Sequence, residues 1–330
     1  MSLEVISMFI GVLVFPGMLF LVALALFTQY LVRKLSARLQ KRMGPSYVGP
    51  AGVMQPFYDF WKLLRAKEVV RTRFSMTKVA EFALLVGISS AVASVIFLPL
   101  NPWGIKSEFD ILMFFYMASV VPLIALVIAS LAMPSPYTAL GVSRLLSLAT
   151  ICEPAFFASI VIPAYLATRS PHSKALFLSI SEASPSVVNL WLNPLTALTL
   201  ALCFISYIFS IQAKAMFPPY NIPEAEQEII AGFETEFSGP LLALARLLHD
   251  LDLTVSILAG IYILLGGPYP FRHFSVQGAI LLVVKYLAVL FVVTFIKNIM
   301  GRYRIEQALV QLFKYGLILA IVAAVLAAII

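Results

Sequence analysis

The sequence predicts an all-α protein that crosses the membrane about eight times. Of its 330 residues, 61% are hydrophobic and 12% are charged, and the mean hydropathy is +0.97. A soluble domain is nearer half apolar and one quarter charged, because its surface has to be polar. The long apolar runs also lack the alternation that a transmembrane β-barrel requires. We therefore expect a single membrane domain over residues 1–330.

Eight stretches with few or no charges mark the expected spans, since about 20 apolar residues cross a bilayer. They cover residues 5–32, 77–99, 109–133, 143–168, 189–212, 238–266, 276–297 and 308–330. Pro16, Pro122, Pro154 and Pro163 are expected to kink their helices, which neighbouring helices can accommodate. Residues 1–32 carry no A-x-A cleavage pattern, so we expect no separate signal peptide.

The basic residues predict the orientation. With eight spans, loops one, three, five and seven lie on one side and carry 16 basic residues, against 4 in the other loops. Because positive loops stay inside, the first set is expected in the cytoplasm, with both termini outside the plasma membrane. The net charge of +7 therefore reflects the basic residues that orient the protein in the membrane, and nucleic acid is not expected as a partner.

The first cytoplasmic loop, residues 33–76, is strongly basic. Within it, apolar positions 53, 57, 60, 61 and 64 recur at helical spacing. This pattern predicts an amphipathic helix that lies at the membrane interface.

The third cytoplasmic loop, residues 213–237, is acidic on a side that otherwise collects positive charge. It holds Glu224, Glu226, Glu228, Glu234 and Glu236. A capping role explains Glu224, because Asn221 stands three residues before it. Glu224, Glu228 and Glu236 share roughly one helical face, however, which favours a funnel through which protons enter.

Five charged residues fall within or at the ends of predicted spans: Glu81, Glu153, Asp250, Asp252 and Lys285. Each charge near a helix centre costs about 2.5–3.5 kcal/mol unless it is paired or hydrated, so such residues indicate ion pathways. The alternatives are an interfacial position for Glu81, and helix-end positions or pairs with Arg246 or Lys285 for the aspartates.

Metal and redox centres are not expected on this chain. Cys152 and Cys203 lie far apart in apolar segments, and His172, His249 and His273 are scattered. These spacings match neither an iron–sulfur ligand set nor a zinc site.

Several segments resemble subunit 1 of complex I, also known as its heel subunit. Residues 40–50 (QKRMGPSYVGP) with Gln55, Asp59 and Lys62 are similar to its first cytoplasmic loop. Residues 223–239 are similar to its acidic loop, Arg144 and Glu153 to an Arg and a Glu nine residues apart, and residues 302–307 to its last loop. The resemblance extends from about residue 33 to the end of the chain.

This resemblance implies a heel subunit that joins a peripheral redox arm to a membrane ion pump. The implied proton-path residues are Glu81, Glu153, Glu224, Glu226, Glu228, Glu234, Glu236, Asp250, Asp252 and Lys285. The implied cavity-lining or arm-docking residues are Gln40, Arg42, Asp59, Lys62, Arg144, Lys214, Arg302, Arg304 and Glu306. The implied partners are an iron–sulfur subunit, a hydrogenase-large-subunit-like chain, antiporter-like and small membrane subunits, and lipid. Iron–sulfur clusters, and in hydrogenases a [NiFe] centre, would sit on those partners.

Three departures from the family pattern weaken the case for a bound quinone. Quinone-reducing members carry a Glu-x-x-Arg run where this chain has Lys214 and Phe217, and a further Glu where it has Val32. The pattern is instead similar to the archaeal ferredoxin-linked relatives, membrane-bound [NiFe] hydrogenase and the sulfane sulfur reductase complex. The alternatives are a quinone- or phenazine-reducing complex, a standalone ion-coupled transporter and a passive anchor for the peripheral arm.

Overall fold

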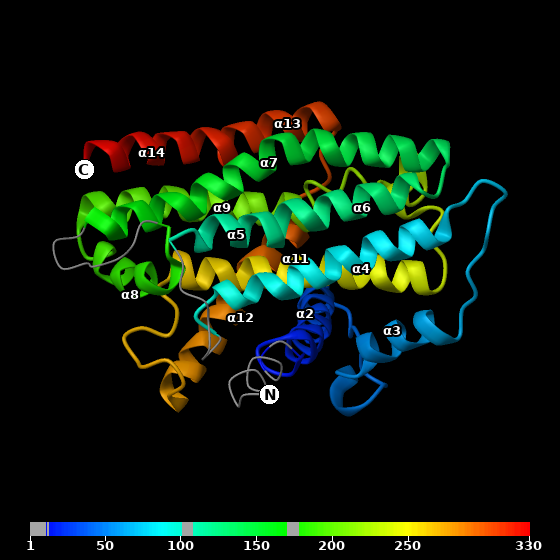
Figure 1. Cartoon of the computed structure of the whole chain (residues 1–330), viewed down its shortest axis with the longest axis horizontal. Coiled ribbons are helices and arrows are strands. Elements are labelled where there is room, and N and C mark those ends of the chain that lie inside the picture. Colours follow the sequence, from blue (N-terminus) through cyan, green and yellow to red (C-terminus); the bar gives the residue numbers. More distant parts are fainter. Residues whose placement is uncertain (1–10, 12, 101–107, 170–177) are drawn as a thin grey trace, which may run out of the picture.

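The protein is a bundle of long helices that run side by side (Figure 1). A computed structural model describes residues 11, 13–100, 108–169 and 178–330, and these residues form helices, turns and loops without a β-strand. Seven helical segments in them are long and apolar enough to span a membrane. The prediction of an all-helical membrane protein is therefore confirmed.

The seven segments follow the predicted order. They are α2 (Met18–Leu39), α4 (Thr77–Ser94), α5 with α6 (Asp110–Phe115 and Val121–Leu131), α7 (Pro136–Arg169), α9 (Pro194–Lys214), α12 (Val276–Ile299) and α13 with α14 (Ile305–Leu312 and Leu319–Ile329). Three short helices, α3 (Gln55–Arg65), α8 (Ile180–Leu190) and α10 (Glu226–Ile229), lie between them.

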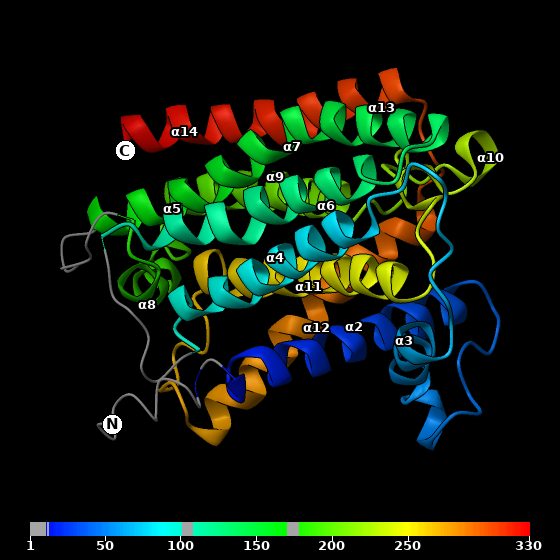
Figure 2. The same cartoon turned by 45° about the vertical axis from the view of Figure 1, so that its right-hand side comes forward.

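The predicted span 238–266 corresponds to α11 (Pro240–Ile263), which is too charged to count as a span by composition because it carries Arg246, Asp250 and Asp252. It nevertheless lies at the centre of the bundle, packed against α2, α4 and α9 (Figure 2). Every residue from Leu253 to Ile263 is buried. The surrounding helices thus shield this charged helix from lipid.

Several predicted helix boundaries were wrong. The expected helix over 189–212 is interrupted after Leu190, and α9 begins at Pro194. Pro is favoured at the first helical position, where its missing N–H is not needed. At the other end of the chain, Pro16 precedes α2 and does not kink it, while α2 continues to Leu39 and includes Arg33. Residues 5–10 and 12 of the first predicted span lie outside the described part.

Two helices contain a π-helical turn, Tyr116–Val120 between α5 and α6 and Phe313–Ile318 between α13 and α14. The first precedes Pro122, which has no N–H to donate to the preceding turn. The Ser90 hydroxyl of α4 instead donates to the Met117 carbonyl at 2.8 Å, and Ser206 of α9 donates to the Gly316 carbonyl at 2.8 Å. Neighbouring helices therefore satisfy carbonyls that the widened turns expose.

The acidic loop and the short helix α3 lie at the same end of the bundle, whereas α8 and the C-terminus lie at the other (Figures 1 and 2). The helix expected within residues 53–64 is present as α3, which packs on α2 and α11. An ion pair of 2.7 Å between Asp59 of α3 and Arg33 of α2 fixes it there.

Candidate functional site

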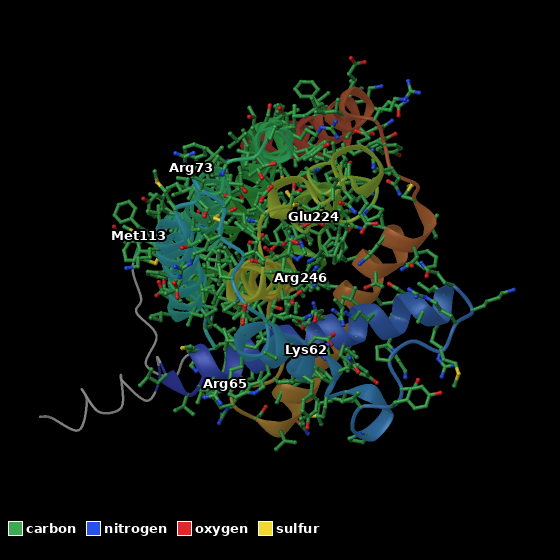
Figure 3. All side chains as sticks on the ribbon, turned by 90° about the vertical axis from the view of Figure 1, so that its right-hand side faces the viewer. Lys62, Arg65, Arg73, Met113, Glu224 and Arg246 are labelled. Atoms are coloured by element: carbon green, nitrogen blue, oxygen red, sulfur yellow. The ribbon has the colours of Figure 1, made fainter. Side chains whose placement is uncertain are left out.

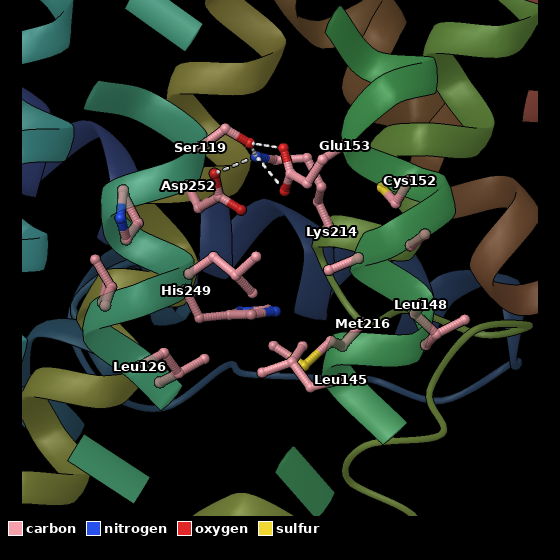
Figure 4. A pocket seen from close by; sticks show the side chains of 15 residues that line it. Ser119, Leu126, Leu145, Leu148, Cys152, Glu153, Lys214, Met216, His249 and Asp252 are labelled. Atoms are coloured by element: carbon pink, nitrogen blue, oxygen red, sulfur yellow. Dashed lines mark hydrogen bonds and ion pairs between the residues drawn. The ribbon is translucent and has the colours of Figure 1, made fainter. Parts of the chain in front are cut away.

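Four polar side chains from four helices meet inside the bundle (Figure 4). Lys214, at the end of α9, lies with its Nζ 3.2 Å from Oδ1 of Asp252 on α11 and 3.7 Å from Oε1 of Glu153 on α7. The ammonium also donates to the Ser119 hydroxyl in the first π turn, and Ser119 donates to Glu153. We call these four residues the Lys214 cluster.

The Lys214 cluster has one cation for two carboxylates. Lys214 is held tightly, because its side chain is only 5% exposed and its Nζ lies 4.6 Å from the centre of the Phe156 ring. With both carboxylates ionised the cluster carries one unbalanced negative charge, which is costly in a buried position. The Lys214 cluster is therefore a buried group of ionisable side chains with one positive charge too few for neutrality.

A small cavity of about 50 Å³ adjoins the cluster and continues toward His249. A cavity of this size has room for about three water molecules. Its walls are mainly apolar and include Leu126, Leu145 and Met216. The polar groups therefore face a confined space that can hold a short chain of water.

His249 connects this cavity to the charges near the loop. Its Nε2 lies 2.7 Å from the Ala215 carbonyl, and since a carbonyl only accepts, Nε2 carries a hydrogen. Its Nδ1 lies 4.0 Å from Oδ1 of Asp250, which is 9% exposed. The imidazole is thus oriented between the cavity and a buried carboxylate.

Glu224 and Glu234 form the inner part of the acidic loop. The pKa of each is raised to about 7, mainly by burial, and the charge of Glu224 contributes to the rise at Glu234. Arg246 opposes both shifts and lies 3.8 Å from Glu234. Glu224 and Arg246 lie near one another at the loop end of the bundle (Figure 3). These two carboxylates can therefore exchange protons near neutral pH.

Glu228 has a different environment from its neighbours. It forms ion pairs with Arg144 of α7 at 2.5 Å and with Arg302 in the loop before α13. The hydrogen bond from Arg144 is the main reason that its pKa is lowered. Glu228 therefore stays ionised and ties α10 to α7 and to the loop before α13. Arg144 thus pairs with Glu228, whereas Glu153 pairs with Lys214.

The remaining predicted site residues are dispersed. Lys285 donates to the carbonyls of Leu265 and Gly267, both at 2.7 Å, and so binds the turn that follows α11. The amide of Gln40 donates to Asn298 at 3.0 Å, and Arg42 lines a pocket beside it. Glu236 is partly buried in the loop. The exposed members are Glu81, Lys62, Glu226, Arg304 and Glu306.

Sequence reasoning missed Ser119 and His249. No sequence signal marks Ser119, because its partners come from helices distant in the chain. His249 carries a usable signal, since it stands three residues before Asp252 and shares its helical face. In the described residues, no group of three or more His, Cys, Asp or Glu side chains could hold a metal ion.

Comparison with known proteins gives consistent results over the whole length. A sequence model of the family described as NADH dehydrogenase matches residues 11–328. The H subunit of the NADH-quinone oxidoreductase of Pelagibacter ubique is 27% identical over 307 residues, which covers 91% of this chain and 88% of the relative. The corresponding protein of Neisseria meningitidis serogroup C is 28% identical over 284 residues, which covers 84% of this chain and 78% of the relative.

A solved structure shares the fold. A chain of the membrane-bound sulfane sulfur reductase, an archaeal respiratory membrane complex, matches with a TM-score of 0.79 at 23% identity. The match covers 98% of this chain and 99% of that chain. The helical arrangement described above therefore occurs in a known membrane complex.

Proposed function

Because this chain belongs to the NADH dehydrogenase subunit 1 family, whose members are membrane components of complex I-like oxidoreductases, we propose that it is the heel subunit of a ferredoxin-linked, ion-pumping complex. In this role it joins a peripheral electron-transfer arm to antiporter-like membrane subunits. Iron–sulfur clusters, and a [NiFe] centre if the complex is a hydrogenase, belong to partner chains. The basic and acidic loops lie on the cytoplasmic side of the plasma membrane.

The chain contributes the beginning of a proton path. Glu224 and Glu234 take up protons at the loop, His249 relays them to water in the cavity, and the carboxylates of the Lys214 cluster receive them. When one carboxylate is neutral, the Lys214 ammonium pairs with the other, so the cation lies at whichever carboxylate lacks the proton. Charge changes at the redox arm then shift, by electrostatic interaction, the distribution of the proton between the two carboxylates.

The observation that carries this proposal is the single buried lysine shared by two carboxylates beside a cavity of water size. A passive anchor has no need of such an arrangement, because burying three charges is costly and apolar residues would pack there equally well. Glu228, held by two arginines, serves as an anchor for the loop and keeps its charge.

The test uses the complete complex in sealed vesicles and compares Glu153→Gln with Glu108→Gln, an exposed carboxylate outside the site. We expect Glu153→Gln to retain electron transfer and to lose at least tenfold in ions moved per electron pair, while Glu108→Gln behaves as wild type. Normal pumping by Glu153→Gln at full redox rate would refute the proposed path. Transport by the chain alone would instead support a secondary transporter.

A quinone-reducing complex is the second candidate, because the relatives named above are NADH-quinone oxidoreductases. The space between α2, α3 and α11 combines apolar walls with Arg33, Asp59, Arg246 and Asp250, as a site for a quinone headgroup would. Its volume of about 20 Å³ has room for about one water molecule, so a quinone ring does not fit. Quinone recovered stoichiometrically from the purified complex would favour this candidate.

A further inference from the structure

A second cavity, distinct from the one beside Lys214, lies where two membrane spans end. It has a volume of about 410 Å³, which is within the range of about 300–1,000 Å³ typical of small-molecule sites. One side is formed by Arg33, Ser36 and Gln40 at the end of α2, and another by Lys297 and Asn298 at the end of α12. Arg42 and the following loop residues complete it.

The lining of this cavity is cationic. Arg33, Arg42 and Lys297 contribute three positive charges, and no Asp or Glu is among its lining residues in the described part of the chain. Asp59 offsets one charge, because it pairs with Arg33 at 2.7 Å from the α3 side. Lys297 lies over the Phe217 ring at 3.7 Å. Glu224 and Asp250 lie outside the lining but within electrostatic range of Lys297, so the surplus of positive charge rests mainly on Arg42.

The neutral side chains of the cavity are held in place. Asn298 donates to the Ser36 hydroxyl at 3.0 Å and to the Thr294 carbonyl at 2.6 Å, while Gln40 donates to the Asn298 side-chain oxygen at 3.0 Å. These bonds join α2 to α12 beneath the cations. The two helices thus present a rigid floor, which a site for a specific group requires.

The surroundings favour a ligand with an apolar tail. The outer face of α12 below the cavity exposes Phe291, Phe295 and Ile299, and the two phenylalanine rings stack with centroids 5.8 Å apart. Leu39 and Met43 are exposed beside its rim. A group that is anionic at one end and apolar at the other would therefore contact complementary surfaces at the ends of both helices.

We propose that this cavity binds the phosphate headgroup of a membrane phospholipid. Arginine and lysine bind phosphate through charge-assisted hydrogen bonds, and a basic pocket between spans on the cytoplasmic side is suited to an anionic headgroup. The acyl chains lie along the exposed apolar face of α12. The lipid thereby connects the ends of α2 and α12 close to the basic loop.

The test measures phospholipid that copurifies with the complete complex in mild detergent, by mass spectrometry after extraction. Arg42→Gln removes a cavity cation, and Arg38→Gln removes an exposed cation of α2 that does not line the cavity. We expect Arg42→Gln to lose one bound phospholipid per complex, and Arg38→Gln and Arg42→Lys to retain it. Equal lipid content in Arg42→Gln and wild type would overturn the proposal.

A titration of delipidated complex separates the possible sources of the phosphate. A short-chain phosphatidylglycerol should bind wild type at least tenfold more tightly than it binds Arg42→Gln, and at least tenfold more tightly than inorganic phosphate does. Equal binding of inorganic phosphate would assign the cavity to a free anion and overturn the lipid. Loss of the peripheral arm from Arg42→Gln with unchanged lipid content would assign the cavity to a protein partner.

Discussion

Replacing Lys214 with methionine tests whether the Lys214 cluster is held together by its one cation. The two carboxylates lie 3.2 Å and 3.7 Å from Nζ. With an effective dielectric constant of about 20, each pair at this separation attracts by about 5 kcal/mol, before the cost of desolvation is subtracted. Removing one member of a buried ion pair destabilises proteins by about 3–5 kcal/mol. We expect a loss of this size, because two carboxylates would remain without a counter-ion.

The informative comparison is with the triple variant Lys214→Met, Glu153→Gln, Asp252→Asn. It has no buried charge to compensate, so we expect it to recover most of the stability that Lys214→Met loses. The melting temperature of the purified complex in detergent ranks the variants, and Lys78→Met, at an exposed position of α4, is the control. The reasoning fails if Lys214→Met has the melting temperature of wild type, or if the triple variant has a lower melting temperature than Lys214→Met.

Three further predictions concern the acidic loop. A Cβ at Gly141 of α7 would lie 2.3 Å from the Phe233 backbone nitrogen. Gly141→Ala should therefore displace the loop and lower the stability by about 1–3 kcal/mol, which the melting temperature measures. The control is Gly301→Ala, whose Cβ meets nothing within 4 Å and which should leave the melting temperature unchanged. Because burial raises the pKa of Glu224 and Glu234 from 4.5 to about 7, the native loop binds more protons than the unfolded loop. The contribution of these two carboxylates to stability should therefore be greatest below about pH 4.5 and decline as the pH rises through 7, whereas Glu228, whose pKa is lowered, contributes in the opposite sense at low pH. Between pH 5 and pH 8, hydrogen exchange of residues 223–237, corrected for the intrinsic rate, should show this decline, and the double Gln variant should lose it. Glu228→Gln should lower the stability by no more than about 1 kcal/mol, since the Glu228 side chain is 46% exposed. The same variant should pump as wild type. A loss of pumping equal to that of Glu153→Gln would return Glu228 to the proton path.

Much of the fold was predictable because hydropathy and charge are local properties of the sequence. The break before α9 is an exception, since residues 189–193 are uncharged and apolar enough to continue a span. The sequence Asn193-Pro194 there is a helix-start signal that hydropathy alone does not register. The π turn at Tyr116–Val120 was not predictable, because the carbonyl it exposes is satisfied by Ser90 from another helix.

The charged members of the site were predictable, but Ser119, His249 and the pairs were not. The cost of charges in the membrane singled out Glu153 and Asp252, and the loop pattern singled out the glutamates. Their partners depend on which helix faces lie together, and this is a tertiary property. Pairing of Asp252 with Arg246 or Lys285 was one alternative, yet Asp252 contacts Lys214, while Lys285 binds the turn that follows α11.

The central position of the charged helix α11 has a consequence for how the protein is made. Arg and Asp residues each oppose transfer of an isolated helix into the bilayer by about 2.5–3.5 kcal/mol. Although α12 follows α11 in the chain, most of the helices that surround α11, among them α2, α4 and α9, precede it. They are therefore already synthesised when α11 leaves the ribosome, and Lys214 is in place to receive Asp252. The order of the helices along the chain thus allows the least membrane-compatible segment to enter the membrane after most of its partners, into a space that those neighbours have prepared.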